Sequence, residues 1–355
     1  MKQIMIVTGT RPDTIKLSPL LRNILRPSYL LVHTGQHYSY EMDRIFFDEM
    51  NLGEPDIKLN TPPIELQGKQ VSYMIEHIEE HLLDKDISAV MVLGDTNSAF
   101  AGAFAAVKLD IPVIHVESGM RSYNRAMPEE INRILIDHIS DYLFAPTSVQ
   151  KKILYNEGIR ENVYVSGDIT WDAIKENITI AYDKSRILEN IGLKRREYYL
   201  LTLHRKENAD NKKRLESILS ALRNIRSPVV FPIHPRTRKN IGRFGLQNLL
   251  QRENIKLIDP VGYLDMLMLE ENSIKILTDS GGIQKEAYYL GVPCITLRGE
   301  TEWTETLKDG RNVLVGADPQ KLMAELQREP VYKKISPGLS PKKIIISRLS
   351  KLGFI

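Results

Sequence analysis

Short apolar runs alternate with segments of helical periodicity along most of the 355 residues. This rhythm predicts parallel strands joined by crossover helices. In the first half, the expected strands are Ile4–Val7, Tyr29–His33, Ala89–Leu93, Val113–Val116, Tyr142–Ala145 and Val163–Val165. In the second half, they are Tyr198–Leu203, Val229–Ile233, Lys256–Ile258, Ile274–Leu277, Cys294–Leu297 and Val313–Val315.

The rhythm is interrupted once, by a polar stretch of helical character at Trp171–Leu188. Because 355 residues also exceed one ordinary core, we expect two domains, residues 1–170 and 171–340. The fold class is α/β, with two Rossmann-like, doubly wound parallel sheets and a cleft between the domains. Ligands of such sheets bind at the carboxyl ends of the strands.

The segment Thr278–Ala287 has the pattern of a phosphate-binding turn. It follows an apolar strand and opens a helix, so unpaired backbone N–H groups and the positive end of the helix dipole face an anion. Gly281 and Gly282 allow close approach of the backbone, and Ser280 adds a hydroxyl. Glu286 lies one turn further along, where its carboxylate can accept hydrogen bonds from ribose. A Gly-rich connection without a ligand is the alternative.

Most other polar clusters also follow expected strands. Arg11 and Lys16 lie in GTRPDTIK, Asp95 in GDTNS, and Glu117 in HVESGMRS. Three further clusters place Glu129 at the start of a helix, His204 beside Arg205, and His234 close to Arg236.

Each of these residues also has a structural explanation. Asp95 can cap a helix, and Glu129 can face the dipole of its own helix. Both histidines can be hydrogen-bonded structural residues, although an arginine beside each favours an anionic ligand. Three acidic positions on the same side as the phosphate-binding turn together favour chemistry.

Composition narrows the class of protein. A net charge of +3, with Lys and Arg spread along the chain, gives no nucleic-acid stripe. No apolar run approaches a membrane span, no signal peptide is expected, and the single cysteine, Cys294, lies in an apolar run. These features predict a cytoplasmic protein.

Metal and redox chemistry are not indicated. The pattern H-x-x-E-H at residues 77–81 matches an inverted zinc-protease motif. Val71, Met74, Ile75, Ile78 and Leu82 would form the buried face of that helix, which leaves its histidines on the flank. G-x-G-x-x-G and Walker motifs are absent, so neither NAD nor ATP is expected.

Taken together, the blocks resemble the non-hydrolysing UDP-N-acetylglucosamine 2-epimerases, which have a GT-B (glycosyltransferase B) architecture. The matching blocks run in order through nearly the whole chain: GTRPDTIK, TGQHYSYEM, GDTNS, HVESGMRS, PEEINR, HRKEN, HPRT, TDSGGIQKEA and TEW.

The resemblance implies roles for residues of this chain. Asp95, Glu117, Glu129 and His204 would form the catalytic set. Arg11, His234, Ser280, Gly282 and Glu286 would hold the nucleotide. Gln36 and His37 would contribute to a second, activating UDP-N-acetylglucosamine site.

The resemblance also implies the assembly of the enzyme. The C-terminal helix, within residues 341–355, would complete the first domain. Homodimers without metal or redox cofactor are expected. Two segments depart from the family pattern: Trp303 stands where many relatives have arginine, and residues 336–341 replace a glycine-rich loop.

The implied reaction is reversible C2 epimerisation of UDP-N-acetylglucosamine to UDP-N-acetylmannosamine, which supplies amino sugars for polysaccharide or glycan synthesis. C2 has no adjacent carbonyl, so a positioned base alone, worth roughly 10²–10⁴ in rate, is inadequate. Elimination of UDP to 2-acetamidoglucal and re-addition would solve this problem.

Several functions compete with this interpretation. They are an epimerase for a related UDP-diacetamido sugar, a hydrolysing epimerase, a GT-B glycosyltransferase and a non-catalytic nucleotide-sugar sensor.

Overall fold

The computed structural model describes residues 3–36, 40–335 and 338–355. The chain divides into two compact units. The first contains the described residues up to 176 together with 338–355, and the second contains residues 177–335.

The first unit is built on a seven-stranded sheet with the order β3-β2-β1-β4-β5-β6-β7. Every recorded strand pair in it is parallel. The strands are β1 (Gln3–Thr8), β2 (Tyr29–His33), β3 (Ile57–Lys58), β4 (Ile87–Leu93), β5 (Val113–Val116), β6 (Tyr142–Ala145) and β7 (Val163–Val165).

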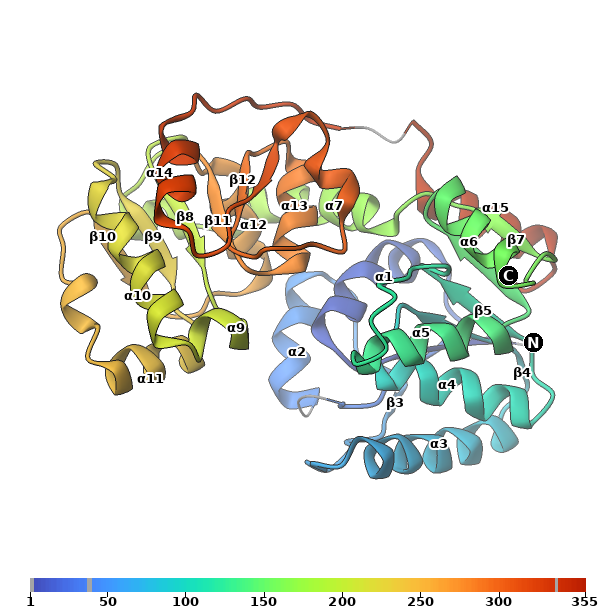
Figure 1. Ribbon diagram of the computed structural model, residues 1–355. Coiled ribbons are helices and arrows are strands. Elements are labelled where there is room, and N and C mark those ends of the chain that lie inside the picture. Colours follow the sequence, from blue (N-terminus) through green and yellow to red (C-terminus); the bar gives the residue numbers. More distant parts are fainter. Residues whose placement is uncertain (1–2, 37–39, 336–337) are drawn as a thin grey trace. The chain divides into compact units, whose positions relative to one another are not determined.

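Helices cover this sheet on both faces, as crossover connections between parallel strands require (Figure 1). They are α1 (Arg11–Asn23), α2 (Tyr40–Glu49), α3 (Gln67–Asp84), α4 (Asn97–Lys108), α5 (Pro128–Ile139), α6 (Ser148–Asn156), the first half of α7 (Ile169–Lys184) and α15 (Pro341–Lys351). Figure 1 shows α3, α4 and α5 side by side, and residues of all three share one apolar cluster with β1 and β4.

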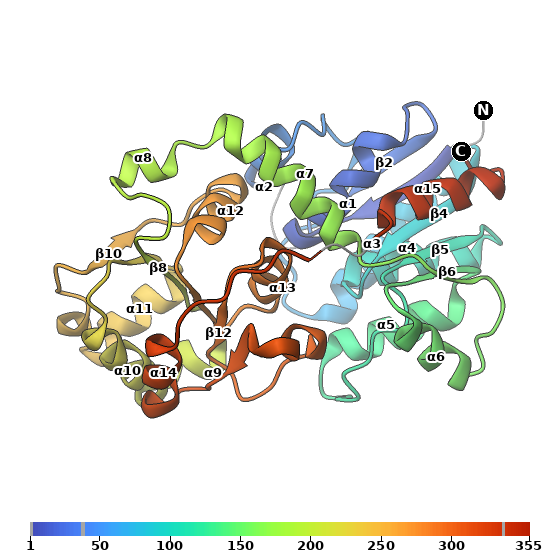
Figure 2. The same cartoon turned by 90° about the horizontal axis from the view of Figure 1, so that it is seen from above.

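The C-terminal helix α15 packs on the first unit, next to α1, in both views (Figures 1 and 2). Ile345 and Leu349 are fully buried on its inner face. Its N-terminus is held by Asp172 of α7, whose carboxylate accepts from the Ser340 hydroxyl and from the Lys342 backbone N–H. The last helix therefore belongs to the core of the first unit.

The second unit repeats the design with a six-stranded sheet, order β10-β9-β8-β11-β12-β13, again parallel in every recorded pair. The strands are β8 (Tyr199–Thr202), β9 (Val229–Pro232), β10 (Ile255–Ile258), β11 (Ile276–Thr278), β12 (Cys294–Thr296) and β13 (Asn312–Leu314). The α-helices are α8 (Ile187–Ile191), α9 (Lys206–Ala209), α10 (Lys212–Ala221), α11 (Pro235–Phe244), α12 (Tyr263–Asn272), α13 (Gly281–Leu290) and α14 (Pro319–Gln327). Three 3-10 segments complete it: Leu222–Asn224, Gln247–Leu249 and Thr304–Gly310.

All twelve strands expected from the apolar runs are present, and the α/β prediction is confirmed. The sequence missed β3, because two residues at a sheet edge leave no periodic signal. The polar stretch expected as one helix is divided between α7 and α8, with a break at Ser185 and Arg186.

The α3 helix has the predicted buried face, made of Met74, Ile78 and Leu82. His77 hydrogen-bonds through Nδ1 to the Tyr73 carbonyl at 2.8 Å and stacks on the Tyr73 ring. These contacts explain the orientation of the His77 ring by interactions within its own helix. In the described part of the chain, no helix is long and apolar enough to span a bilayer.

Candidate active site

In each unit, the parallel strands bring their carboxyl ends to one edge of the sheet, and the polar clusters lie in the loops that follow. In the first unit, these loops follow β1, β4 and β5. In the second unit, they follow β8, β9 and β11.

Lys16 and Glu117 form a largely enclosed ion pair at the first edge. Lys16 Nζ lies 2.6 Å from Glu117 Oε2, and the Glu117 side chain is only 5% exposed. Burial alone would lower the pKa of Lys16. Glu117, Asp168 and Asp95 outweigh this effect and raise the pKa above its ordinary value, so the ammonium stays charged. The Lys16 ammonium therefore lies in direct contact with the Glu117 carboxyl group.

Glu117 has a backbone conformation that is unusual for a residue other than glycine. Its φ is 70°, in the left-handed region, where a side chain costs of order 1–3 kcal/mol. Such strain persists only where surrounding contacts impose it, and it commonly marks functional positions.

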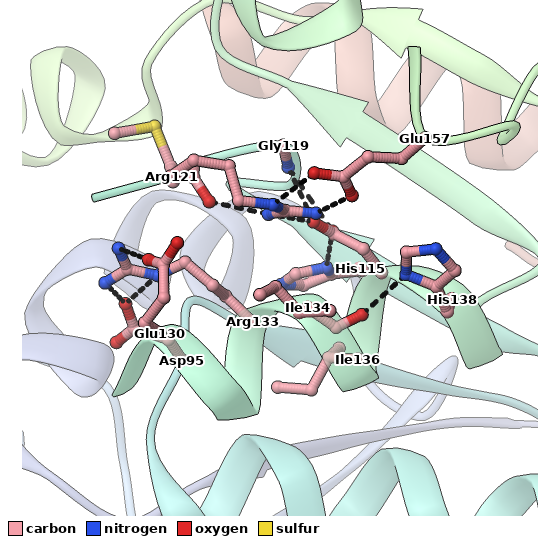
Figure 3. Close-up of polar contacts among 12 residues, drawn as sticks. Asp95, His115, Gly119, Arg121, Glu130, Arg133, Ile134, Ile136, His138 and Glu157 are labelled. Carbon is pink, nitrogen blue, oxygen red and sulfur yellow. Dashed lines mark hydrogen bonds and ion pairs between the residues drawn. The ribbon is translucent and has the colours of Figure 1, made fainter. Parts of the chain in front are cut away.

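Asp95 directly follows Gly94 at the end of β4 and is paired with Arg133 of α5. The guanidinium donates to Asp95 from Nε, at 3.0 Å, and from Nη2. Figure 3 shows Arg133 between Asp95 and Glu130. Burial raises the pKa of Asp95 above its ordinary value, while Arg133 and Lys16 oppose the shift and Glu117 adds to it. Lys16, Asp95 and Glu117 thus form one electrostatically coupled cluster.

Asp13 belongs to the same edge and was not singled out from the sequence. It lies in the first turn of α1, is 6% exposed, and accepts a hydrogen bond from Thr96 Oγ1 at 3.1 Å. Burial raises the pKa of Asp13 to about 7, although Thr10, Lys16 and Thr96 act in the opposite direction.

Glu129 and Glu130 have different environments. Glu129 is exposed in the first turn of α5. Glu130 is buried and accepts from the backbone N–H groups of Ser122 and Tyr123, at 2.8 and 2.9 Å. Burial would raise the pKa of Glu130, but these hydrogen bonds and Arg133 hold it below its ordinary value. Glu130 therefore fixes the loop before α5, and a catalytic role for Glu129 stays a prediction.

Two other predicted binding residues of the first unit lie near α1 and α4. The Arg11 guanidinium lies over the Phe46 ring, 4.4 Å from its centroid. Gln36 Oε1 accepts from the backbone N–H and hydroxyl of Ser98, both at 2.8 Å. His37 lies outside the described residues.

At the second edge, the loop after β8 is organised by Asp279, which sequence reasoning also missed. Asp279 is fully buried and accepts from the backbone N–H groups of His204 and Arg205, at 3.1 and 3.0 Å. It also accepts from Asn208 Nδ2. The only available signal was its position directly after a strand and before Ser280.

His204 and His234 come together at this edge, with ring centroids 5.6 Å apart. Burial lowers the pKa of both rings, aided by Arg236 and opposed by Asp279. His234 Nδ1 accepts from the Arg236 backbone N–H at 3.1 Å and so caps α11. The hydrogen of a neutral His234 is therefore on Nε2.

α13 begins at Gly281, directly after β11 and the two residues Asp279 and Ser280, and its use as a phosphate-binding turn stays a prediction. Ser280 is the N-cap residue and makes no capping hydrogen bond with its side chain. A Cβ on Gly281 would lie 2.9 Å from Glu302 Oε1 and 3.1 Å from Trp303 Nε1, so a larger residue there would require these side chains to shift. A Cβ on Gly282 would meet only Ser280 Oγ, at 3.8 Å.

Trp303, one of the two departures, packs beside this turn. The Lys285 ammonium lies over its ring, 3.7 Å from the centroid. Its neighbour Glu302 is paired with Arg298 at 2.9 Å and lies 3.7 Å from Arg205. The other departure lies partly outside the described residues, and its last residue, Pro341, begins α15.

Glu286 lies on α13 close to a second carboxyl group, Glu270 of α12. Glu270 is fully buried. Burial, and then the neighbouring Glu286, raise the pKa of Glu270 well above its ordinary value. A role for Glu286 in accepting hydrogen bonds from ribose stays a prediction.

Comparison with known proteins gives consistent similarities. A family profile described as UDP-N-acetylglucosamine 2-epimerase matches residues 24–337. The UDP-N-acetylglucosamine 2-epimerase of Methanocaldococcus jannaschii is 47% identical over 92% of this chain and 91% of its own length. The UDP-2,3-diacetamido-2,3-dideoxy-D-glucuronate 2-epimerase of Pseudomonas aeruginosa is 42% identical over 94% and 93%. A crystal structure of the M. jannaschii UDP-GlcNAc 2-epimerase with UDP-GlcNAc and UDP has a TM-score of 0.86, at 44% identity, covering 99% of this chain and 100% of that one.

Asp13 gives a pH-dependent prediction. Its pKa in the folded protein, about 7, exceeds the ordinary value of 3.8, so the folded state binds this proton more tightly. The stability it contributes is complete below pH 3.8 and is lost as pH rises through about 7. We expect the unfolding free energy of Asp13→Asn to decrease less than that of the wild type between pH 4 and 8. Urea denaturation measures this difference.

The exposed Asp84 at the end of α3 provides the matched control. Asp84→Asn should leave the wild-type pH dependence unchanged. An Asp13→Asn variant with the same pH slope as the wild type would contradict the burial argument.

Proposed function

The chain belongs to the UDP-N-acetylglucosamine 2-epimerase family, and on this basis we propose that it interconverts UDP-N-acetylglucosamine and UDP-N-acetylmannosamine. The structural observation that carries the proposal is the coupled cluster of Lys16, Asp95 and Glu117 at one strand edge. In the other unit, the N-terminus of α13 after β11 supports a diphosphate-binding role for that helix end.

The proposed reaction proceeds by elimination and re-addition. A base removes the C2 proton while the C1–O bond breaks, which gives 2-acetamidoglucal and UDP. UDP then adds back to C1, and a proton is delivered to the opposite face of C2. No electrons are gained or lost overall, so the scheme requires no redox cofactor.

The first unit would supply the proton transfers. Lys16 lies 2.6 Å from Glu117, and burial raises the pKa of Asp95, so the two carboxyl groups lie in different electrostatic environments. Groups with separated pKa values are what a reaction with both a base and an acid needs. We propose that Asp95 or Glu117 is the base, with Glu129 as the third member of the set.

The second unit would hold UDP. Backbone N–H groups at Gly281 and Gly282, with the Ser280 hydroxyl, would bind the diphosphate, and Glu286 would accept from ribose. His234, with Arg11 of the first unit, would stabilise charge on the departing phosphate, and His204 would assist charge or proton movement near it. The proposal requires both edges to act on one sugar nucleotide.

The sugar specificity has a second candidate. The P. aeruginosa relative, at 42% identity, is named for a diacetamido glucuronate nucleotide. A single pocket contact distinguishes such sugars, since a hydrogen-bonding site rejects a substrate that lacks the partner group. We propose UDP-N-acetylglucosamine because the matching family profile and the M. jannaschii relative both carry that name.

The remaining parts of the proposal concern partners and location. We propose a cytoplasmic homodimer that binds no nucleic acid or membrane, in accord with a net charge of +3 that forms no basic stripe. Gln36 and His37 would contribute to a second UDP-N-acetylglucosamine site.

The direct test is incubation of UDP-N-acetylglucosamine alone in D₂O, followed by NMR. We expect UDP-N-acetylmannosamine, with deuterium at C2 of both sugars. Asp95→Asn and Glu117→Gln should each slow exchange by about 10²–10⁴, the usual contribution of an acid or base. The exposed α3 residue Glu80 gives the control Glu80→Gln, which should exchange at the wild-type rate.

The outcomes separate the rival functions. Release of free N-acetylmannosamine would indicate a hydrolysing enzyme. Ligand binding without C2 exchange would indicate a sensor. Near-normal turnover in both carboxylate variants would refute the assignment of the base.

Gly282→Ala tests the diphosphate contact separately. The added Cβ has room in the unliganded protein, so thermal stability should not fall. A diphosphate close to the backbone would meet the methyl group, and UDP affinity measured by calorimetry should fall about tenfold, or ~1.4 kcal/mol.

Gly242 of α11 gives a matched helical control, since its Cβ would also have only one distant neighbour, Gln247 Nε2 at 3.9 Å. Gly242→Ala should bind UDP normally. Unchanged UDP affinity in Gly282→Ala would show that the diphosphate does not approach this residue.

A further inference from the structure

Behind the loop that presents Glu117 lies a buried charge network formed by His115, Arg121, Asp137 and Glu157 (Figure 3). The His115, Asp137 and Arg121 side chains are at most 1% exposed, and Glu157 is 26% exposed. None of these side chains has a role in the proposed chemistry. Buried charges rarely stabilise a fold more than apolar residues would, so a different use is indicated.

His115 connects two parts of the active-site edge. Its Nε2 lies 2.8 Å from the Gly94 carbonyl oxygen, and its Nδ1 lies 2.8 Å from Asp137 Oδ1. A carbonyl oxygen only accepts, so Nε2 donates to Gly94, and Nδ1 shares a hydrogen bond with the Asp137 carboxyl group. Gly94 immediately precedes Asp95, and His115 therefore ties the Asp95 loop to α5.

Asp137 also connects the loop that carries Glu117 to α5. Its carboxylate accepts from the Gly119 backbone N–H, at 3.1 Å to Oδ2, and from Arg121 Nη1 at 2.6 Å. Arg121 also forms a bidentate pair with Glu157, at 2.8 and 2.6 Å. Every side-chain hydrogen bond described for Asp137 is thus directed to this loop or to His115.

The loop needs such an anchor because its backbone is strained. Glu117 and Gly119 both have positive φ, of 70° and 77°. A Cβ on Gly119 would lie 2.6 Å from the Gln150 carbonyl oxygen, so this turn is closely packed as well. Without the Asp137 carboxylate, the Gly119 N–H and Arg121 would lose an acceptor, and the loop would relax.

We propose that His115 and Asp137 are positioning residues, which fix the Asp95 and Glu117 carboxylates relative to each other through the Gly94 carbonyl and the Gly119 N–H. The inference rests on the proposed function, because it concerns the same proton transfers. A misplacement of about 1 Å in a catalytic group can reduce the rate by about 10²-fold.

The test compares two substitutions of Asp137 in the full-length protein. Asp137→Ala removes the acceptor, and we expect kcat for epimerisation to fall by roughly 10- to 100-fold. KM and the affinity for UDP should change by less than about twofold, because the contacts described for Asp137 include none of the residues proposed to hold the nucleotide.

Asp137→Asn should retain most of the activity that Asp137→Ala loses. Its amide oxygen can accept from Gly119 and Arg121, and its amide N–H can donate to a neutral His115 that still donates to Gly94. We expect kcat within about threefold of the wild type. A purely structural role would instead alter thermal stability without this difference in kcat.

His138, the next residue of α5, is the matched control. It is exposed and hydrogen-bonds only to the Ile134 carbonyl of its own helix among the contacts described (Figure 3). His138→Gln should have wild-type kcat.

Each result has a defined meaning. An Asp137→Ala variant with wild-type kcat, or equal losses in Asp137→Ala and Asp137→Asn, would overturn the inference. If Asp137→Ala does not fold, His115→Gln decides: it keeps a donor for Gly94 but places an amide oxygen against Asp137, and an unchanged kcat would overturn the inference. A wild-type protein without C2 exchange would instead refute the proposed function and this inference together.

Discussion

The parallel direction of the strands is the constraint on which the rest of the molecule depends. Every recorded pair in both sheets is parallel, so each crossover helix starts at the same edge of its sheet. The loops at that edge can carry polar groups, because the strands themselves are covered by helices and are almost entirely apolar. The edge therefore collects Lys16, Asp95 and Glu117 in one unit, and His204, His234 and Ser280 in the other.

Charges gathered at such an edge need partners, and the partners determine what each group can do. Lys16 is paired with Glu117, and Arg133 is shared between Asp95 and Glu130. Asp279 accepts backbone N–H groups and thereby shapes the loop that carries His204, whose Nδ1 lies 3.4 Å from the same carboxyl group. Buried carboxylates in this molecule thus have two uses, one as candidate reactive groups and one as anchors for loops.

The sequence was sufficient for the fold, because apolar runs of strand length separated by amphipathic helices are a strong local signal. The sequence also predicted that Asp95, Glu117 and Ser280 lie at strand ends. In a parallel sheet, residues that directly follow the strands all lie at the same edge. The sequence could not distinguish Glu129 from Glu130, which are adjacent and chemically identical. Only the fold of residues 122–123 over Glu130 separates them. Asp13, Asp137 and Asp279 were missed for a related reason, since burial and partners distant in the chain define their roles.

The central claim is that the C1–O bond to UDP breaks and reforms while both products remain bound. Positional isotope exchange measures this directly, with UDP-N-acetylglucosamine carrying ¹⁸O in the bridge between C1 and the β-phosphate. The account predicts that the label moves into the non-bridging oxygens of the β-phosphate in recovered UDP-N-acetylglucosamine. Epimerisation at C2 with the label retained in the bridge would contradict it.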